Sequence, residues 1–436
     1  MTSHTTCPER LPRSALLDRQ FRHLQVLLET NLDRPGFWRE KLAQAGVKPS
    51  EIRSPSDLSR IPLTTKHELV ADQAAHPPYG SAVGTPPEQC LRLHQTSGTT
   101  GRPLAWLDTS RNWEWILNCW EQNFRMAGLQ PTDRLGFPFS FGPFLSFWAA
   151  FEGAQRLGRL CVAGGGLSTS ARLKLIFDYQ LTVICCTPTY ALRMAEVAAA
   201  EGLDLANGPV RSLIVAGEPG GCLSTTRSRM EQAWGARVFD HWGMTEIGPL
   251  ATEVVEDPGH LYVLESECLA EVIDPQTLQP VSPGETGELV ITNLGRIDNP
   301  LIRYRTGDLV RGEYVPDAAG YHLLRLTGGI LGRTDQMITV RGNNVYPAAL
   351  EELLREFADV VEFRIQVTIR KAMTHLKIEV EPNPARWESG SADLTQQIAH
   401  RIKDRLNFQV DVEAVPPETL PRFEMKGKRF QRIVEE

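Results

Sequence analysis

The chain of 436 residues lacks the features that mark several common classes of protein. No stretch approaches the roughly 18 apolar residues of a membrane-spanning helix. The polar N-terminus has no apolar core of the kind that a signal peptide needs. The net charge is -7, so no basic excess favours binding to nucleic acid or to an anionic membrane. None of the eight cysteines forms a C-x-x-C pair, and several lie in apolar runs, as reduced thiols do. These absences predict a cytoplasmic protein that binds neither nucleic acid nor membrane.

Two familiar nucleotide-binding spacings are also missing. Only two residues separate Gly98 from Gly101, and Arg-Pro follows, whereas a Walker P-loop needs four residues and a Lys-Ser/Thr ending. The three glycines at 164–166 are followed by Leu-Ser-Thr, which breaks the G-x-G-x-x-G spacing of dinucleotide-binding folds. The sequence therefore excludes both motifs.

What the chain does contain is an alternation of short apolar runs and helical patterns. The expected strands are 134–137, 160–163, 181–186, 210–216 and 237–239, and the expected helices are 13–42 (one helix or a pair), 113–126, 170–177, 190–200 and 348–357. Such an alternation predicts an α/β fold, with a parallel or mixed sheet covered by helices and ligands gathered beyond the strand ends. The length allows a large body and a smaller lobe.

A loop rich in hydroxyls and glycines lies between the expected helices 13–42 and 113–126. It contains Thr96, Ser97, Gly98, Thr99, Thr100 and Gly101, with Arg102 at its rim. Glycines let backbone N–H groups approach an anion closely, and the hydroxyls add further donors, so the loop suits phosphate. Taken alone, the run also fits a polar surface turn.

A second group of chemically useful residues spans Asp240 to Glu246. Trp242 offers an aromatic face for a purine, Thr245 a hydroxyl for a phosphate oxygen, and Glu246 a carboxylate for Mg2+. A buried Trp beside a helix-capping Thr-Glu pair is the alternative.

Three further segments carry isolated charges. Asp308 suits the two hydroxyls of a ribose, and Arg333 suits a sugar or a phosphate. The basic tail at 420–429 holds Lys426 and Lys428, and such a tail is often merely solvated.

In this order, and over nearly the whole chain, these segments resemble the adenylate-forming superfamily of acyl-CoA synthetases and luciferases. The resemblance implies a catalytic group of Lys426, Thr245 and Glu246, with Glu246 also the metal ligand and Lys428 the alternative lysine. It implies a hinge at Asp335 and a CoA channel at Gly342, Asn343 and Asn344. The nucleotide site implied by the resemblance comprises Thr96, Ser97, Gly98, Thr99, Thr100, Gly101, Gly217, Glu218, Pro219, Asp240, His241, Trp242, Gly243, Asp308 and Arg333.

Within the superfamily the chain most resembles the phenylacetate-CoA ligase branch, through its segments 187–190 and 301–308. This implies a large N-terminal domain, 1–334, with helix-covered β-sheets, and a small mobile α+β C-terminal domain, 335–436. Arg102, Trp242 and His241 depart from the lysine, tyrosine and aliphatic residue common in relatives. Some members hold zinc, but His260 and Cys268 are too few for a four-ligand site, so we expect none.

The expected acid pocket is aromatic. Four phenylalanines lie within 137–144, and Phe141, Gly142, Ala216, His241 and Met244 are expected to line the pocket. Flat walls with small residues at the base suit a benzoate, hydroxybenzoate, aminobenzoate or phenylacetate. The resemblance implies ATP, Mg2+ and coenzyme A as partners, in a monomer or homodimer. A stand-alone adenylating enzyme that loads an acyl carrier protein or an amine is the alternative, and a non-catalytic nucleotide-binding protein is a third.

Overall fold

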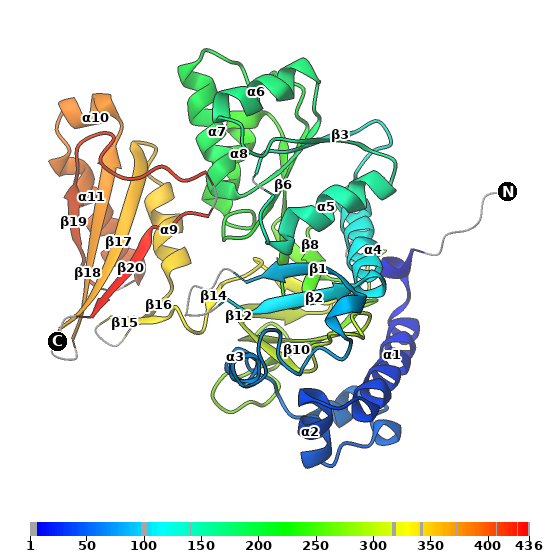
Figure 1. The fold of residues 1–436 in the computed structure, drawn as a ribbon. Coiled ribbons are helices and arrows are strands. Elements are labelled where there is room, and N and C mark those ends of the chain that lie inside the picture. Colours follow the sequence, from blue (N-terminus) through cyan, green and yellow to red (C-terminus); the bar gives the residue numbers. More distant parts are fainter. Residues whose placement is uncertain are drawn as a thin grey trace.

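The computed structural model describes residues 7–96, 103–139, 141–315, 320–340, 343–370, 373–406, 408–424 and 426–434. The elements from β15 (Ile338–Val340) onward form a smaller lobe beside a larger one (Figure 1). Within the described residues, no helix is long and apolar enough to cross a bilayer. The mixed α/β fold that the sequence predicts is confirmed, whereas the boundary between residues 334 and 335 stays a prediction.

The helices lie in both lobes. They are α1 (Arg13–Asp33), α2 (Phe37–Gln44), α3 (Lys66–Ala75), α4 (Ser110–Met126), α5 (Leu145–Arg156), α6 (Thr169–Asp178), α7 (Pro188–Ala200), α8 (Ser224–Trp234), α9 (Pro347–Arg355), α10 (Pro384–Glu388) and α11 (Ala392–Leu406), with short 3-10 turns at Pro8–Arg10, Pro49–Glu51, Pro55–Arg60 and Pro87–Gln89. The expected helix over 13–42 is a pair, because Gly36, with φ of 125°, separates α1 from α2.

The large lobe is built on one mixed sheet and a small hairpin. The hairpin pairs β1 (Cys90–Gln95) with β2 (Ala105–Thr109). The mixed sheet contains β3 (Arg134–Phe137), β4 (Leu160–Ala163), β5 (Val183–Cys186), β6 (Ser212–Ala216), β7 (Arg237–Met244), β8 (Gly248–Thr252), β9 (His260–Val263), β10 (Cys268–Ile273), β11 (Thr286–Asn293), β12 (Tyr304–Glu313), β13 (Arg325–Thr327) and β14 (Gly332–Arg333). The run β4-β3-β5-β6-β7 is parallel, and the pairing from β7 to β10 is antiparallel.

Burial explains the composition of the parallel strands. Every residue of β5 and of β6 is buried, because helices cover both faces of this part of the sheet. Helices α6, α7 and α8 gather on one side (Figure 1) and share a core with these strands that includes Tyr190, Leu213 and Trp234. Helix α7 begins with Pro at its first position and a Thr187 side chain that accepts the N–H of Tyr190.

One strand is longer than expected. The sequence predicts a strand over 237–239, whereas β7 continues to Met244 because its second half pairs antiparallel with β8. The motif from Asp240 therefore begins inside the sheet, and only Thr245 and Glu246 lie in the turn that follows.

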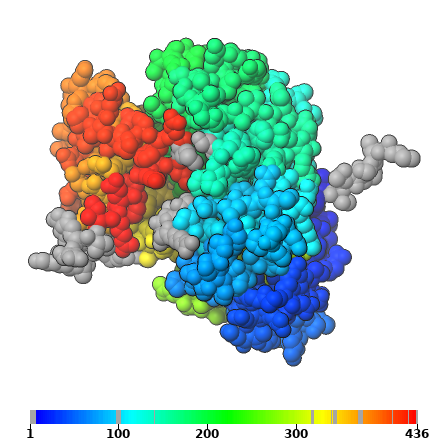
Figure 2. Space-filling model, in the orientation of Figure 1, coloured from blue at the N-terminus to red at the C-terminus, as the bar shows by residue number. Residues whose placement is uncertain are grey.

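The smaller lobe packs helices against a four-stranded sheet. Its strands are β15, β16 (Asn343–Val345), β17 (Val360–Arg370), β18 (Met373–Pro382), β19 (Asp411–Ala414) and β20 (Phe430–Val434), of which the last four form the sheet in the order β19-β18-β17-β20. The red segment between β19 and β20 leaves this sheet and reaches the large lobe near α7 (Figure 1). In space-filling view the two lobes lie against each other (Figure 2).

Candidate active site

Three of the predicted residues meet on adjacent parts of the mixed sheet. Asp308 lies within β12 and is buried. One of its carboxylate oxygens accepts the indole N–H of Trp242 at 2.9 Å, and the other accepts Nη1 of Arg333 at 2.9 Å. Arg333 also donates from Nε to Asp335 at 3.0 Å. The structure thus joins Trp242, Asp308, Arg333 and Asp335 in one chain of polar contacts.

The environment of Asp308 changes its acidity. Burial raises the pKa of this carboxyl group to about 6, although the charge of Arg333 and the hydrogen bond from Trp242 act in the opposite direction. Gly307, with φ of 77°, gives the Arg333 guanidinium room, since a Cβ on it would lie 2.8 Å from Nη2. Asp308 is therefore a buried carboxyl group with a raised pKa, and Trp242 and Arg333 donate hydrogen bonds to it.

Thr245 and Glu246 occupy the turn between β7 and β8, and a buried arginine from elsewhere in the chain holds that turn. Nη1 of Arg296 donates to the backbone carbonyls of Thr245 at 2.7 Å and of Glu246 at 2.9 Å. The same guanidinium forms a bidentate ion pair with Asp108 on β2, and neither side chain has exposed surface. The backbone of the turn is thus fixed from one side.

The carboxylate of Glu246 lies beside a lysine and a tyrosine. Its Oε1 is buried and accepts no hydrogen bond, and Nζ of Lys66 lies 3.4 Å away. Within the described residues, no cluster of three or more His, Cys, Asp or Glu side chains could hold a metal by itself. One carboxylate, here ion-paired with Lys66, fits Mg2+, which takes one or two carboxylates and completes its shell with phosphate oxygens and water.

Lys426 reaches this site from the tail of the smaller lobe. A Cβ on Gly217 would lie 3.0 Å from Cε of Lys426, so the lysine stem passes directly over the loop that follows β6. The residue as a whole is exposed, yet desolvation by the surrounding protein lowers the pKa of its ammonium group. The charge of Glu218, followed by that of Glu246, opposes this shift. Lys428, the alternative lysine, is exposed.

The loop after β6 contributes Gly217, Glu218 and Pro219. Gly217 has φ of 96°, a left-handed conformation that glycine adopts without strain. Oε1 of Glu218 accepts the N–H of Thr189 at 2.8 Å, and Oε2 accepts the N–H of Gly427 at 2.7 Å. Pro219 is exposed beside them.

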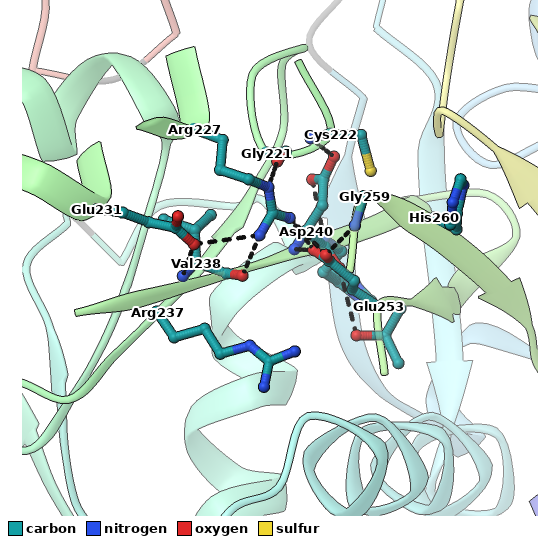
Figure 3. Close-up of polar contacts among 12 residues, drawn as sticks. Gly221, Cys222, Arg227, Glu231, Arg237, Val238, Asp240, Glu253, Gly259 and His260 are labelled. Atoms are coloured by element: carbon teal, nitrogen blue, oxygen red, sulfur yellow. Dashed lines mark hydrogen bonds and ion pairs between the residues drawn. The ribbon is translucent and has the colours of Figure 1, made fainter. Parts of the chain in front are cut away.

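Asp240 lies in a buried polar cluster with Cys222, Arg227 and Glu253 (Figure 3). Its carboxylate accepts the backbone N–H groups of Cys222 at 2.9 Å and of His241 at 3.0 Å. Glu253 accepts the N–H of Asp240 at 2.8 Å and is ion-paired with Arg227. Burial, reinforced by the charge of Glu253, raises the pKa of Asp240 to about 7. This carboxyl group therefore stabilises the backbone of β7 and of the loop at Cys222. His260 lies apart from it in Figure 3.

Two of the residues expected to line the acid pocket, Phe141 and Gly142, belong to an aromatic cluster. Phe141 packs against Trp148 and Phe139, with ring centroids 4.6 Å apart in both pairs, and Phe151 lies 5.5 Å from Phe141. The indole N–H of Trp148 donates to the carbonyl of Gly142 at 3.0 Å. Ring contacts and the Trp148–Gly142 hydrogen bond therefore hold the side chains of this cluster in place.

On β7 and β6 the expected pocket residues have small or aromatic neighbours. His241 is buried against Trp120, at 4.3 Å between centroids, and burial lowers the pKa of its imidazole to about 3, so it is neutral. Ala216 is buried, and Met244 packs partly buried against the same core. A side chain on Gly243 would meet the backbone of Gly248 and Pro249, so the chain passes there without one.

Several predicted residues lie outside the described residues, namely Ser97, Gly98, Thr99, Thr100, Gly101 and Gly342. At the edge of that gap, the buried Thr96 accepts the N–H of Leu104 on its Oγ1 at 3.0 Å. Asn343 and Asn344 belong to β16. This strand pairs with β15, which begins three residues after Asp335. The predicted roles of all these residues stay predictions.

Three residues that contact the site were not predicted from the sequence, because no motif marks them. Lys66 begins α3, Asp108 lies within β2 and Arg296 lies in the loop after β11. Arg296 and Asp108 are 188 positions apart, and neither belongs to a recognisable motif. Only the fold brings them to the turn at Glu246.

Comparison with known proteins places this geometry in a family. The model of the AMP-binding enzyme family matches residues 35–295, and that of the AMP-binding enzyme C-terminal domain matches residues 342–432. The chain is 33% identical to a phenylacetate-coenzyme A ligase of Thermus thermophilus over 447 aligned positions, covering 98% of each chain.

Solved structures agree in fold and differ in lobe arrangement. A 2-hydroxyisobutyryl-CoA ligase in the postadenylation state, in complex with 2-HIB-AMP, has a TM-score of 0.92 at 29% identity, covering 99% of this chain and 94% of that one. The same ligase with 2-HIB-AMP and CoA in the thioesterification state, also 29% identical, has a TM-score of 0.74, with coverage of 100% and 94%. The chain belongs to the AMP-binding enzyme family and is an AMP-forming acyl-CoA ligase of the phenylacetate-CoA ligase type.

Proposed function

We propose that this ligase activates an aromatic carboxylic acid, of the benzoate, hydroxybenzoate, aminobenzoate or phenylacetate type, and transfers it to coenzyme A. The observations that carry the proposal are the packed aromatic cluster around Phe141 and the buried His241, which lies against Trp120. The likeness to phenylacetate-CoA ligases supports the same class of acid.

The first half-reaction gives the acid a leaving group. A carboxylate is a poor electrophile, so one of its oxygens attacks the α-phosphorus of ATP, and the bond from that phosphorus to the pyrophosphate oxygen breaks. Pyrophosphate departs, and an acyl-AMP mixed anhydride remains. The protein's contribution to such a phosphoryl transfer is mainly positioning and charge stabilisation.

Lys426 is the residue that we assign to this step. The charges that act on its ammonium group are mostly carboxylates, namely Glu218, Glu246 and Asp308. A cation in that position can offset the charge that develops between the acid oxygen and the α-phosphate. Trp242 and Asp308 would hold the nucleoside, with the carboxylate accepting ribose hydroxyls, and Arg333 would orient that carboxylate.

The divalent cation implied by the family has a matching acceptor here. Glu246, supported by the fixed Thr245–Glu246 turn, would hold Mg2+, which when bound neutralises phosphate charge. The hydroxyls from Thr96 onward would contact the pyrophosphate.

The second half-reaction needs a thiol where Lys426 stands. The CoA sulfur attacks the acyl carbon, AMP leaves with the bonding electrons, and the thiol proton passes to solvent or to the phosphate. We propose that the smaller lobe turns about Asp335 between the two steps, bringing Gly342, Asn343 and Asn344 to the pantetheine. The closer likeness to the postadenylation state than to the thioesterification state supports a lobe arrangement that precedes this turn.

The acceptor is tested together with the acid. Purified protein is given ATP and Mg2+ with a panel of acids: benzoate, 2-aminobenzoate, 4-hydroxybenzoate, phenylacetate, 2-hydroxyisobutyrate and hexanoate, each with and without CoA. Pyrophosphate release that is strongest with one aryl acid and rises with CoA, together with the thioester by mass spectrometry, is the expected result.

Two outcomes would contradict the proposal. A preference for 2-hydroxyisobutyrate or hexanoate would assign the site to aliphatic acids. Pyrophosphate release that does not change with CoA, with no thioester, would instead favour an enzyme that loads an acyl carrier protein or an amine.

We propose the cytoplasm as the place of the reaction, because buried thiols such as Cys185 and Cys268 suit a reducing compartment.

A further inference from the structure

Glu218 belongs to the large lobe but contacts both lobes. It lies in the loop between β6 and α8, half-buried, and its Oε1 accepts the N–H of Thr189 at 2.8 Å. Thr189 is the second residue of α7, so its N–H is one of the donors that a helix leaves unpaired at its N-terminus. An anion is also favoured there by the helix dipole. The carboxylate is therefore held firmly by the large lobe.

The second oxygen of Glu218 reaches the tail of the smaller lobe. Oε2 accepts the N–H of Gly427 at 2.7 Å, and Gly427 directly follows Lys426 in the chain. A side chain at 427 would collide with the guanidinium of Arg429. That guanidinium cannot easily move, because it is ion-paired with Glu362 and donates to Oγ1 of Thr189 at 2.9 Å. The tail thus docks on Thr189 and Glu218 together.

The same carboxylate is the leading favourable charge on Lys426. The charged groups that face the lysine are Glu218, Glu246, Asp308 and Arg333, and the first of these acts most strongly to keep it protonated. Desolvation acts against the ammonium form. Glu218 therefore influences both where Lys426 lies and whether it carries a charge.

We propose that Glu218 is a positioning residue for Lys426, which fastens the tail to the N-terminus of α7 during adenylation and releases it before thioester formation. The inference rests on the proposed function, because it assumes that Lys426 serves only the first half-reaction. It gives Glu218 a different role from direct contact with the nucleotide, since both of its oxygens already accept backbone N–H groups.

The test compares the two half-reactions in Glu218→Gln. Adenylation is followed by ATP–pyrophosphate exchange, and thioester formation is followed from synthetic acyl-AMP and CoA. The variant keeps the side-chain shape but loses the charge and one acceptor. We expect exchange to fall about 10- to 100-fold in kcat, with KM for ATP within about threefold of the parent, whereas thioester formation stays within about twofold or rises.

Glu201→Gln is the matched control. Glu201 caps the other end of α7 and accepts a hydrogen bond from Ser170, so this change removes one negative charge without touching the tail. It should leave both half-reactions unchanged.

The pH profile separates positioning from general damage to the fold. Lys426 must be protonated to act, so the rate of exchange falls as pH rises through its pKa. Without Glu218 the remaining neighbours Glu246, Asp308 and Arg333 support the ammonium form less well, and the alkaline limb of the profile should move to lower pH. A merely loosened structure would lower the rate at every pH without moving that limb.

A double-mutant comparison completes the design. In a Lys426→Ala background, Glu218→Gln should cost adenylation nothing further, because the residue acts through the lysine. Equal loss of both half-reactions, a raised KM for ATP with kcat intact, or full additivity with Lys426→Ala would overturn the inference. If Lys426→Ala itself retains normal exchange, the proposed function fails first, and that result is distinct from any behaviour of Glu218→Gln.

Discussion

The guanidinium of Arg296 donates two hydrogen bonds to the carboxylate of Asp108, with N–O distances of 2.7 and 2.6 Å, and both side chains are fully buried. Through the same guanidinium the pair also fixes the two carbonyls of the Thr245–Glu246 turn. A connection of this kind ties the stability of the large lobe to the geometry of a proposed metal ligand.

Replacing Arg296 by Met is expected to leave Asp108 buried without its partner. Removing one member of a buried ion pair typically costs about 3–5 kcal/mol, and we expect a loss of that size in the free energy of unfolding. Urea unfolding measures it. The double change Arg296→Met and Asp108→Leu should recover much of the stability but not the Mg2+ dependence of pyrophosphate release. Recovery of both would show that the pair does not position Glu246.

The two tail lysines are expected to differ sharply. Lys426→Ala should lower ATP–pyrophosphate exchange by about 10²- to 10³-fold, the usual effect of losing one preorganised charged donor. Thioester formation from synthetic acyl-AMP should survive. Lys428→Ala serves as the control and should exchange normally. The reverse pattern would assign the role to Lys428.

Nucleoside binding should depend on pH through Asp308. Its pKa is about 6, and the ribose hydroxyls that we propose it binds would donate to the ionised form. Binding of adenosine, which carries no phosphate to titrate, is therefore expected to weaken about tenfold per pH unit below that value and to level off above it. Calorimetric titration between pH 5 and 8 measures the affinity. Asp308→Asn should bind weakly at every pH, and a persisting slope in that variant would point to another group.

Stability should also depend on pH, through Asp240. Its folded pKa of about 7 lies above its usual value of 3.8, so between these values the native state holds a proton that the unfolded state lacks. The contribution of this group is therefore full at low pH, declines as pH rises, and is lost above about pH 7. Urea unfolding at several pH values should show that decline in the parent. Asp240→Asn should lack it, whatever the absolute stability of the variant. An unchanged slope would contradict the assignment.

Asp335→Pro is expected to separate the half-reactions. Proline fixes φ near -65° and restricts the residue before it, so a rotation about this position would be blocked. The variant also loses the contact to Arg333, and Asp335→Ala controls for that loss. One half-reaction should persist and the other should fall in the proline variant alone. Normal rates for both would remove Asp335 as the hinge.

The local sequence pattern predicts the bounds of an element where pairing with a neighbouring strand does not extend it. The strands at 134–137 and 160–163 have the predicted bounds, because each is a short apolar run flanked by turn residues. The expected strand at 237–239 was too short for a tertiary reason, namely the antiparallel partner β8, which no local signal announces.

The candidate site divides in the same manner. Trp242, Asp308 and Arg333 stand in short motifs, and the structure brings them into contact. The groups that support them come from remote positions, such as Lys66 opposite Glu246 or Asp108 opposite Arg296, and their partners are defined only by topology. The two backbone bonds of Glu218 are likewise invisible in a sequence, where the residue reads as part of a nucleotide loop.

The thiols of the large lobe bear on the safety of an activated acyl group. Burial raises the pKa of Cys186 on β5 and of Cys222 beside Asp240, and the nearby carboxylates of Glu218 and Asp240 raise them further. A thiol held in its neutral form is a poor nucleophile. An acyl-adenylate formed in the cleft would therefore meet little competition from these two sulfurs, and the enzyme would be protected from acylating itself while it waits for its acceptor.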